Sequence, residues 1–212
     1  MRIDYLGVSL IRLCEEDIEE VRLWRNAEHV RMNMEYQVLI SQEAQRKWFH
    51  SINNIQHFHF IIQIGHQRIG MVSAARINWN TRTGDAGIFI GEQSYLGSPH
   101  AVFAVLAMMD FMFEVMGIER LEAKVNRLNR PAVFFNQKLG YQAKEPTSQS
   151  LFQEYYVTKA TYFQRAKALR RAAQQLYGDC MKIQYRKGIW NRLDQCLAAV
   201  HTEMYTVQCK TY

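Results

Sequence analysis

The segment spanning residues 84–141 constrains the fold more than any other part of the chain, because it predicts a strand, a helix, a second strand and a second helix in succession. Residues 86–91 (AGIFIG) form a short apolar run that ends at a glycine, the pattern of a buried strand. Pro99 suits the first turn of a helix, where its missing N–H costs no hydrogen bond. The apolar residues 101–116 then predict a well-buried helix, which Gly117 ends.

The second half of this segment repeats the order of a strand followed by a helix. Residues 120–125 (RLEAKV) predict a strand, and Asn129 is the expected N-cap of a helix with Pro131 in its first turn. Gly140 closes that helix. A loop that opens a helix gathers free N–H groups at one spot, where the helix dipole favours an anion. On the local pattern alone, an anion site and a turn that binds nothing both remain open.

Two motifs lie in this segment. The first covers residues 96–101, where Leu96 and Pro99 depart from the pattern Gln/Arg-x-x-Gly-x-Gly/Ala and Ala101 fits it. The second pattern, Asn-x-x-Ala-(apolar)-x-x-Tyr-x-Lys-x-Gly-(Phe/Tyr), is matched by Asn129, Ala132, Val133, Lys138, Gly140 and Tyr141. Asn136 stands at its tyrosine position. Together they resemble the acetyl-CoA-binding half of the GCN5-related N-acetyltransferases (GNAT family), and the resemblance extends over roughly residues 8–160.

The resemblance implies an α/β (α+β) fold over residues 1–161, with a mixed, mostly antiparallel sheet of six or seven strands flanked by helices. Residues 8–13 predict the first strand, and residues 57–65 and 67–78 predict a hairpin. Residues 152–161 predict the last strand. Ser41 is the expected N-cap of a helix between the first strand and the hairpin.

Residues 162–212 lie outside the family core and predict a basic, mostly helical C-terminal extension. Its expected helices are residues 163–177 and a final helix from Arg192 through about Tyr205. Residues 159–212 hold 10 Lys+Arg against 3 Asp+Glu, whereas residues 1–158 hold 16 against 17. A solvated basic helix accounts for this charge, and since no nucleic-acid motif accompanies it we expect no nucleic-acid partner. Packing on the core and pairing in a homodimer are both compatible with the sequence.

Several classes of protein are excluded by composition and spacing. No apolar run approaches the roughly 18 residues that a membrane span needs, and no charged-then-apolar signal segment begins the sequence. The four cysteines lack CxxC spacing, so we expect reduced thiols and a cytoplasmic protein. His57 and His59 alternate along one strand without a third ligand nearby, so we expect surface histidines and no metal.

The segment between the first strand and the hairpin lines the acceptor site in the resembled family. Its Trp-Arg-Asn run, Met-rich loop and Ile-Ser-Gln-Glu run look like two subgroups, the acetyltransferases of amino-sugar nucleotides (the pseudaminic-acid type) and those of ribosomal-protein N-termini. Side chains in or beside a loop are the acceptor-site candidates: Arg25, Asn26, Met34, Glu35 and Tyr36. We expect Trp24, Trp48 and Phe49 to pack in the core on helix faces.

The resemblance also implies which residues contact acetyl-CoA. It assigns the pantetheine arm to the backbone of Ile88, Phe89 and Ile90 with Asn129 and Phe135 nearby, and the pyrophosphate to Leu96 and the amides of Gly97, Ser98, His100 and Ala101. Pro99 removes one amide donor from this loop and Leu96 removes a polar anchor.

Acyl transfer to an amine needs a polarised carbonyl, a neutral amine and good positioning. Glu92, at the end of the central strand, is the candidate base, with a solvated loop carboxylate as the equal alternative. Asn136 stands where many family members have the tyrosine that protonates the departing thiolate, and its amide hydrogen-bonds a thiol without protonating it.

The predicted function is therefore acetyl transfer from acetyl-CoA to a primary amine of a small molecule or peptide. An amino-sugar nucleotide is the first choice of acceptor and a protein N-terminal amine the second. The alternative is a non-catalytic binding or assembly protein that keeps the fold and has a degraded pyrophosphate loop.

Overall fold

The fold is built on a single mixed sheet. The computed structural model describes residues 1–145, 150–186, 194–196 and 205–209. Strands in these residues follow the order β10-β9-β1-β2-β3-β4-β5-β6-β8-β7, and of their pairs only β5–β6 and β9–β10 are parallel. The strands are β1 (Arg2–Tyr5), β2 (Val8–Arg12), β3 (Phe58–Ile64), β4 (Gln67–Asn78), β5 (Thr83–Ile90), β6 (Arg120–Asn126), β7 (Gln142–Ala143), β8 (Phe152–Thr158), β9 (Met181–Tyr185) and β10 (Tyr205–Cys209).

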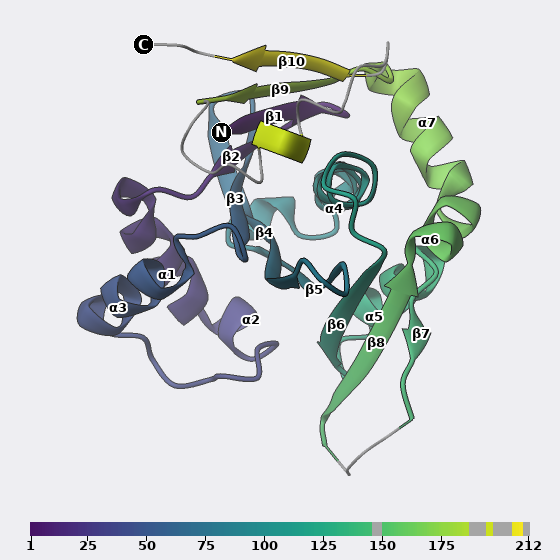
Figure 1. Cartoon of the computed structure of the whole chain (residues 1–212). Coiled ribbons are helices and arrows are strands. Elements are labelled where there is room, and N and C mark those ends of the chain that lie inside the picture. The colour runs from purple at the N-terminus through teal and green to yellow at the C-terminus, as the bar shows by residue number, and fades with distance from the viewer. Residues whose placement is uncertain (146–149, 187–193, 197–204, 210–212) are drawn as a thin grey trace.

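Helices cover both faces of this sheet, which confirms the predicted fold class. Figure 1 shows α1, α2 and α3 gathered on one side, and α4, α6 and α7 on the other. The helices are α1 (Ile18–Asn26), α2 (Glu28–Arg31), α3 (Gln42–Ile52), α4 (Pro99–Asp110), α5 (Arg130–Lys138), α6 (Lys159–Arg165) and α7 (Lys167–Tyr177). None of the helices in the described part of the chain has the length and apolarity that crossing a bilayer requires.

The alternation of side chains along β3 divides the interior into two cores. Phe60 and Ile62 point into the larger core, beneath α4, while Ile61 points into a smaller core beneath α1 and α3. Successive side chains of a strand face opposite sides of a sheet, so this near-continuous apolar run indicates burial on both faces. The helix α4 is buried along residues 103–110, which makes it the centre of the larger core.

The central segment folds as its sequence predicts. β5, α4, β6 and α5 follow one another, and α4 continues through a π-helical turn at Phe111–Val115 before Gly117 adopts a φ of +69°. The side chain of Asn129 accepts a hydrogen bond from the Ala132 amide at 3.2 Å, which is the expected N-cap of α5. Ser41 caps α3 in the same way, accepting from the Ala44 amide at 3.1 Å.

The predicted strand at residues 8–13 is confirmed as β2, but it is not the first strand, because β1 precedes it. β1 and β2 form a hairpin in which Tyr5 pairs with Val8. Leu6 and Gly7 make its two-residue turn with φ values of 52° and 73°. Such turns favour glycine and asparagine at both positions, and leucine in the first position hides the turn from a search by sequence.

The C-terminal extension takes part in the same sheet. Its first predicted helix is divided in two, with Ala166 between α6 and α7, and the predicted boundary at residue 161 falls inside α6. β9 then pairs antiparallel with β1, and β10 pairs parallel with β9. The extension therefore lengthens the sheet beyond the expected six or seven strands. Of the helix predicted from Arg192 onward, only residues 194–196 lie within the described residues, and they are helical.

A buried polar cluster attaches the extension to α4. Asp110 is 1% exposed and accepts hydrogen bonds from the Tyr162 hydroxyl at 2.7 Å and from Nε of Arg170 at 3.0 Å. Glu114, one turn further along, lies 3.5 Å from the same guanidinium. Burial raises the pKa of Asp110 even though Arg170 lies beside it. This cluster joins three helices at the back of the larger core.

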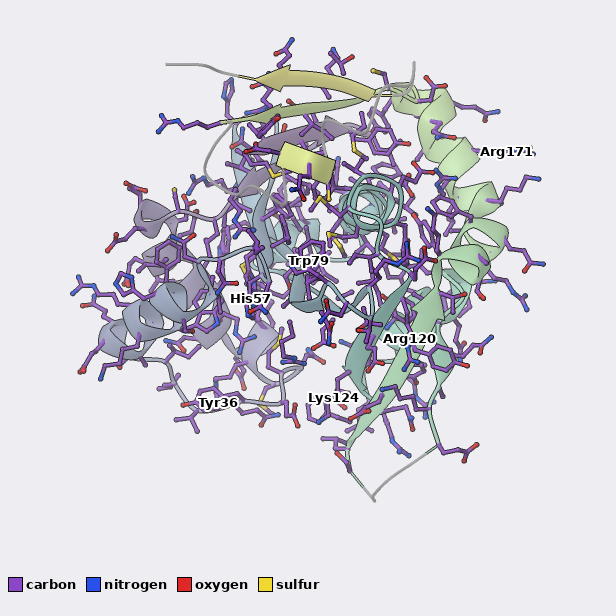
Figure 2. All side chains as sticks on the ribbon, viewed as in Figure 1. Tyr36, His57, Trp79, Arg120, Lys124 and Arg171 are labelled. Atoms are coloured by element: carbon purple, nitrogen blue, oxygen red, sulfur yellow. The ribbon has the colours of Figure 1, made fainter. Side chains whose placement is uncertain are left out.

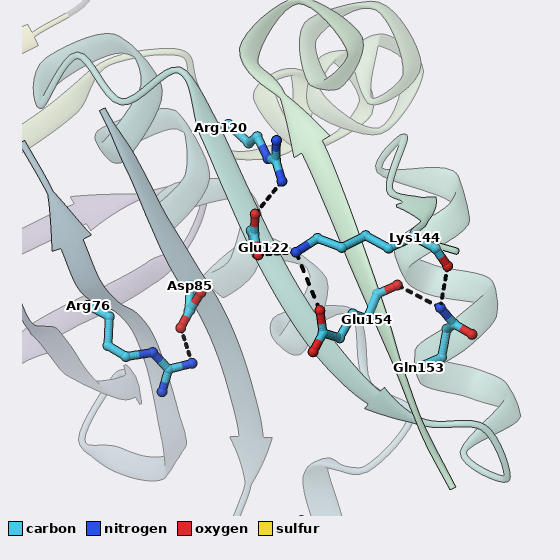
Figure 3. A network of polar contacts seen from close by, with 7 residues as sticks. All are labelled: Arg76, Asp85, Arg120, Glu122, Lys144, Gln153 and Glu154. Atoms are coloured by element: carbon cyan, nitrogen blue, oxygen red, sulfur yellow. Dashed lines mark hydrogen bonds and ion pairs between the residues drawn. The ribbon is translucent and has the colours of Figure 1, made fainter. Parts of the chain in front are cut away.

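Ion pairs brace the sheet where β5 and β6 run side by side. Figure 3 shows Glu122 of β6 between the cations of Arg120 and Lys144, with Glu154 of β8 on the far side of Lys144. Asp85 of β5 pairs with an arginine of β4 in the same view. These contacts tie β5 to β4, and β6 to β8 through Lys144, on either side of the β5–β6 pair.

Candidate active site

A cleft of about 760 Å³ passes through the sheet where β5 and β6 part. The two strands are paired only from Thr83 to Asp85, although β5 continues to Ile90 and β6 to Asn126. Residues 86–90 line one wall and residues 123–126 the other. Side chains of α4 and α5 line the cleft on one face of the sheet, and those of α1 and α3 line it on the opposite face. Beyond Asp85, the edge of β5 that faces β6 offers backbone groups without a strand partner.

The N-terminus of α4 meets this cleft at Leu96 and Ala101. Of the four amides predicted to hold a pyrophosphate, that of Ser98 donates instead to the Tyr95 carbonyl at 3.1 Å. His100 and Ala101 lie in the first turn, where helical geometry supplies no acceptor for their N–H groups. The loop therefore keeps part of a donor set for an anion, together with the favourable end of the helix dipole.

The start of α5 supplies the facing part of the cleft. Asn129, Phe135 and Asn136 all line it, as predicted for residues beside the cofactor or its sulfur. The Oδ1 atom of Asn129 is occupied by the helix cap. Tyr141 also lines the cleft, and burial raises its pKa, so the phenol stays protonated.

The predicted acceptor-site residues divide into two groups. Arg25, Met34 and Tyr36 line the cleft. Asn26 instead exchanges hydrogen bonds with the backbone of residue 40, and Glu35 pairs with Lys124 of β6 at 2.5 Å. Figure 2 shows Tyr36 and Lys124 at the same end of the molecule, where the loop after α2 approaches β6. The loop is thus tied to α1 through Asn26 and to β6 through Glu35.

Glu92 is not among the residues that line the cleft. Its carboxylate accepts a hydrogen bond from the indole N–H of Trp24 at 3.0 Å. The Trp24 ring also packs so tightly on Gly91 that an added Cβ there would lie 2.1 Å from the ring. The ring nitrogen Nε2 of His29 lies 3.1 Å from the Gly91 carbonyl. Together these contacts fix the end of β5 against α1 and α2, and we propose that the Glu92 carboxylate has a positioning role.

We expect Glu92→Gln to retain kcat/KM within about threefold, because the amide oxygen still accepts from Trp24. Glu92→Ala removes that acceptor and is expected to cost more, about tenfold, through displacement of β5. Steady-state kinetics of both variants over a range of pH test this. A loss of a hundredfold or more in Glu92→Gln, together with loss of the basic limb of the pH profile, would identify Glu92 as the base.

The sequence did not identify several of the cleft residues. The clearest correction is the position of His59, which was expected at the surface. It is 7% exposed rather than at the surface, it lines the cleft, and its ring lies 5.2 Å from that of Trp48. Trp48 itself is half-buried and lines the cleft, whereas Trp24 and Phe49 lie in the core as expected. The period-two alternation at residues 57–60 was the available signal, since it places His59 opposite the buried phenylalanines. Among the described residues no three potential metal ligands gather.

The sequence model described as an acetyltransferase (GNAT) domain matches residues 8–142 of this chain. The chain belongs to the GNAT acetyltransferase family. This acetyltransferase accordingly uses acetyl-CoA as cosubstrate for transfer to an amine, as the motifs in residues 96–101 and 129–141 suggested. The cleft fits that cosubstrate, because the edge of β5, which lacks a strand partner beyond Asp85 among the described residues, leads to a helix N-terminus where first-turn amides have no acceptor within the helix.

Solved structures similar to this acetyltransferase support the fold. Spermidine N-acetyltransferase from Vibrio cholerae, in complex with CoA and spermine, superposes with a TM-score of 0.67 at 16% identity, covering 74% of this chain and 98% of the other. A domain from Methanocaldococcus jannaschii gives 0.63 at 17% identity, covering 71% and 97%. A dodecameric form of the Vibrio enzyme gives 0.61 at 17% identity, covering 76% and 98%. No curated protein matches the sequence significantly.

Proposed function

We propose that this acetyltransferase acts on the primary amine of an amino-sugar nucleotide, with a protein N-terminal amine as the second choice. The observation that carries this proposal is the charge of the cleft. No aspartate or glutamate is among the described residues that line it, whereas the cation of Arg25 is. Lys124 lines the cleft as well, but it is paired with Glu35, so Arg25 supplies the charge on which the proposal rests. A polyamine such as the spermine bound by the Vibrio enzyme would meet no carboxylate there, so an acceptor with negative charge fits better.

Bound acetyl-CoA supplies the acetyl group as a thioester. The residues of this chain position the two substrates and polarise the thioester carbonyl. The free edge of β5 offers N–H groups to a carbonyl held between β5 and β6. The amides of His100 and Ala101 attract the phosphates at the start of α4. The compartment under α1 and α3 then holds the acceptor on the opposite face of the sheet, so that the two substrates meet within the gap.

In this arrangement water accepts the proton of the attacking amine. Glu92 is bound to Trp24, and both ring nitrogens of His29 have neighbours, the Gly91 carbonyl and the Gln93 amide at 3.2 Å. His59 is neutral because burial, aided by the nearby charges of Arg12 and His57, lowers its pKa to about 3. A water chain through the open cleft is the remaining acceptor for the proton.

We expect Asn136→Ala to lower kcat by less than about tenfold, because an amide stabilises a departing thiolate only by hydrogen bonding. Single-turnover measurements at saturating substrates isolate this step. A loss above roughly a thousandfold would assign Asn136 a larger part in the transfer, since acid catalysis itself is typically worth 10²–10⁴-fold.

The acceptor class is tested by thiol release from acetyl-CoA with a panel of amines. An amino-sugar nucleotide is expected to give at least about a tenfold higher kcat/KM than spermidine, with N-terminal peptides between them. Spermidine as the best acceptor would contradict the proposal. Calorimetric titration of acetyl-CoA should precede the panel, because an absence of binding at millimolar concentration would leave only a non-catalytic protein with this fold.

A further inference from the structure

The part of the cleft beneath α1 and α3 is continuous with the rest of the cleft and has its own set of polar groups. We call it the α1–α3 compartment. It is bounded by helix residues on one side and by the sheet on the other. Its lining consists of Val21, Arg25, Gln45, Trp48, His59 and Met71. Apolar walls around a few polar groups are typical of a small-molecule site.

Arg25 carries a charge that nothing in the described part of the chain neutralises. It makes no ion pair or hydrogen bond there, and its guanidinium lies 5.9 Å from the centre of the Phe89 ring. Burial lowers its pKa, so the cation is partly desolvated. Arg22, one turn earlier on α1, is by contrast bound to Glu19 at 2.7 Å. A half-buried cation without an anion is costly, and a ligand oxyanion relieves that cost.

Two further groups in this compartment also lack partners. His59 is 7% exposed, and neither of its ring nitrogens has a hydrogen-bond partner among the described residues. Gln45 is 3% exposed, and its Nε2 atom has no acceptor there either. Buried polar groups in folded proteins are nearly always paired, so such a gathering of exceptions calls for an explanation. A ligand that completes these hydrogen bonds provides one.

The chemistry of the ligand follows from the hydrogen-bonding groups of Arg25, Gln45 and His59. The guanidinium has only donors, the Nε2 of an amide is a donor, and a neutral imidazole offers one N–H. Donors and positive charge therefore predominate in the compartment, so its ligand must offer acceptor oxygens, and the second ring nitrogen of His59 is left to accept from a hydroxyl or a water. We propose that the α1–α3 compartment binds a negatively charged oxygen group of the amine acceptor, a phosphate or a carboxylate, through Arg25, Gln45 and His59.

This inference rests on the proposed function and refines it. It turns a general preference for anionic acceptors into a defined subsite on the α1–α3 face of the sheet, across the gap from the α4 N-terminus. Phosphate and carboxylate share the chemistry of several acceptor oxygens around one negative charge, and both suit a guanidinium. The two sources differ only in the rest of the acceptor molecule.

The kinetic test uses two matched pairs of acceptors. One pair is an amino-sugar nucleotide and the methyl glycoside of the same amino sugar, and the other is a dipeptide and its C-terminal amide. The variants are Arg25→Ala and Arg25→Lys. The control is Lys47→Ala, which removes an exposed cation of α3 that pairs with Glu43 outside the cleft.

For one of the two pairs, we expect the wild type to show a kcat/KM at least about tenfold higher for the anionic acceptor than for the neutral one. A hydrogen bond to a charged group commonly contributes a factor of about ten or more. Arg25→Ala should lower kcat/KM for that member about thirtyfold and leave its neutral partner within about threefold. Arg25→Lys should keep part of the preference, and Lys47→Ala all of it. Equal losses for charged and neutral acceptors in Arg25→Ala would overturn the subsite.

A binding measurement separates this inference from the proposed function. A nucleoside diphosphate and the free dipeptide are each titrated calorimetrically into protein saturated with CoA, which leaves the compartment as the open anion site. Binding that weakens at least tenfold in Arg25→Ala but not in Lys47→Ala supports the subsite even if no amine in the panel is acetylated. No binding of either probe to the CoA-saturated protein overturns it, whatever the panel shows.

Discussion

Arg170→Ala is expected to lower the free energy of unfolding by about 3–5 kcal/mol, because it leaves the Asp110 carboxylate in the core without its cation. Asp110 is 1% exposed, and the guanidinium that neutralises it is 16% exposed. Denaturant unfolding followed by circular dichroism measures the change. Arg171→Ala is the matched control, since Arg171 is exposed on the same helix and points outward in Figure 2.

The control is expected to change stability by less than about 0.5 kcal/mol, as exposed substitutions usually do. The double variant Asp110→Asn, Arg170→Ala should recover part of the loss, because the neutral amide oxygen still accepts from Tyr162 and no charge is left buried. Equal shifts for Arg170→Ala and Arg171→Ala would show that the cluster does not hold the extension to α4.

Acid is expected to unfold the wild-type protein more readily than the variant His59→Phe. Burial lowers the pKa of His59 to about 3, against an ordinary value of 6.5. Between these two pH values the unfolded chain binds a proton at residue 59 that the folded chain does not. The stability that a neutral His59 provides is therefore complete above pH 6.5 and is lost as the pH falls toward 3.

The expected loss from this one group is on the order of 5 kcal/mol, because each pKa unit corresponds to about 1.4 kcal/mol. Phenylalanine has a similar shape and does not titrate, so the difference in stability between variant and wild type should grow as the pH is lowered. The exposed His66 provides the control as His66→Ala. Parallel pH profiles for wild type and His59→Phe would refute the assignment of this proton to His59.

Local signals in the sequence predicted the elements that depend on near neighbours. Each of these signals fixes structure within a few residues of itself. They are the glycine-bounded apolar run at the end of β5, the proline at the start of α4, and the helix caps at Ser41 and Asn129. The same local order supplied the two motifs that identified the family. These features are set by propensity and capping, which a single sequence displays.

Features that depend on distant pairing were not predicted. The separation of β5 from β6, which opens the cleft, is a property of two strands and has no mark in either one. Glu92 was predicted to be the base because it follows β5, whereas its hydrogen bond to Trp24, which joins residues 68 positions apart, has no local signal. His59 was assigned to the surface because the helix that covers it comes from another part of the chain. Burial and partners of this kind follow from the tertiary structure alone.

The pairing of β1 with β9 has a consequence for the order in which the protein is made. Ile3 faces Ile183 across this pair, so about 180 residues of synthesis separate the two strands. At about 5–20 residues per second, a ribosome needs roughly 10–40 s to cover that distance. Until then the outer edge of the β1–β2 hairpin presents unpaired N–H and C=O groups to any passing strand. The newborn chain therefore carries an unpaired edge at β1 until β9 has been made, and β9 then protects that edge from pairing with other chains.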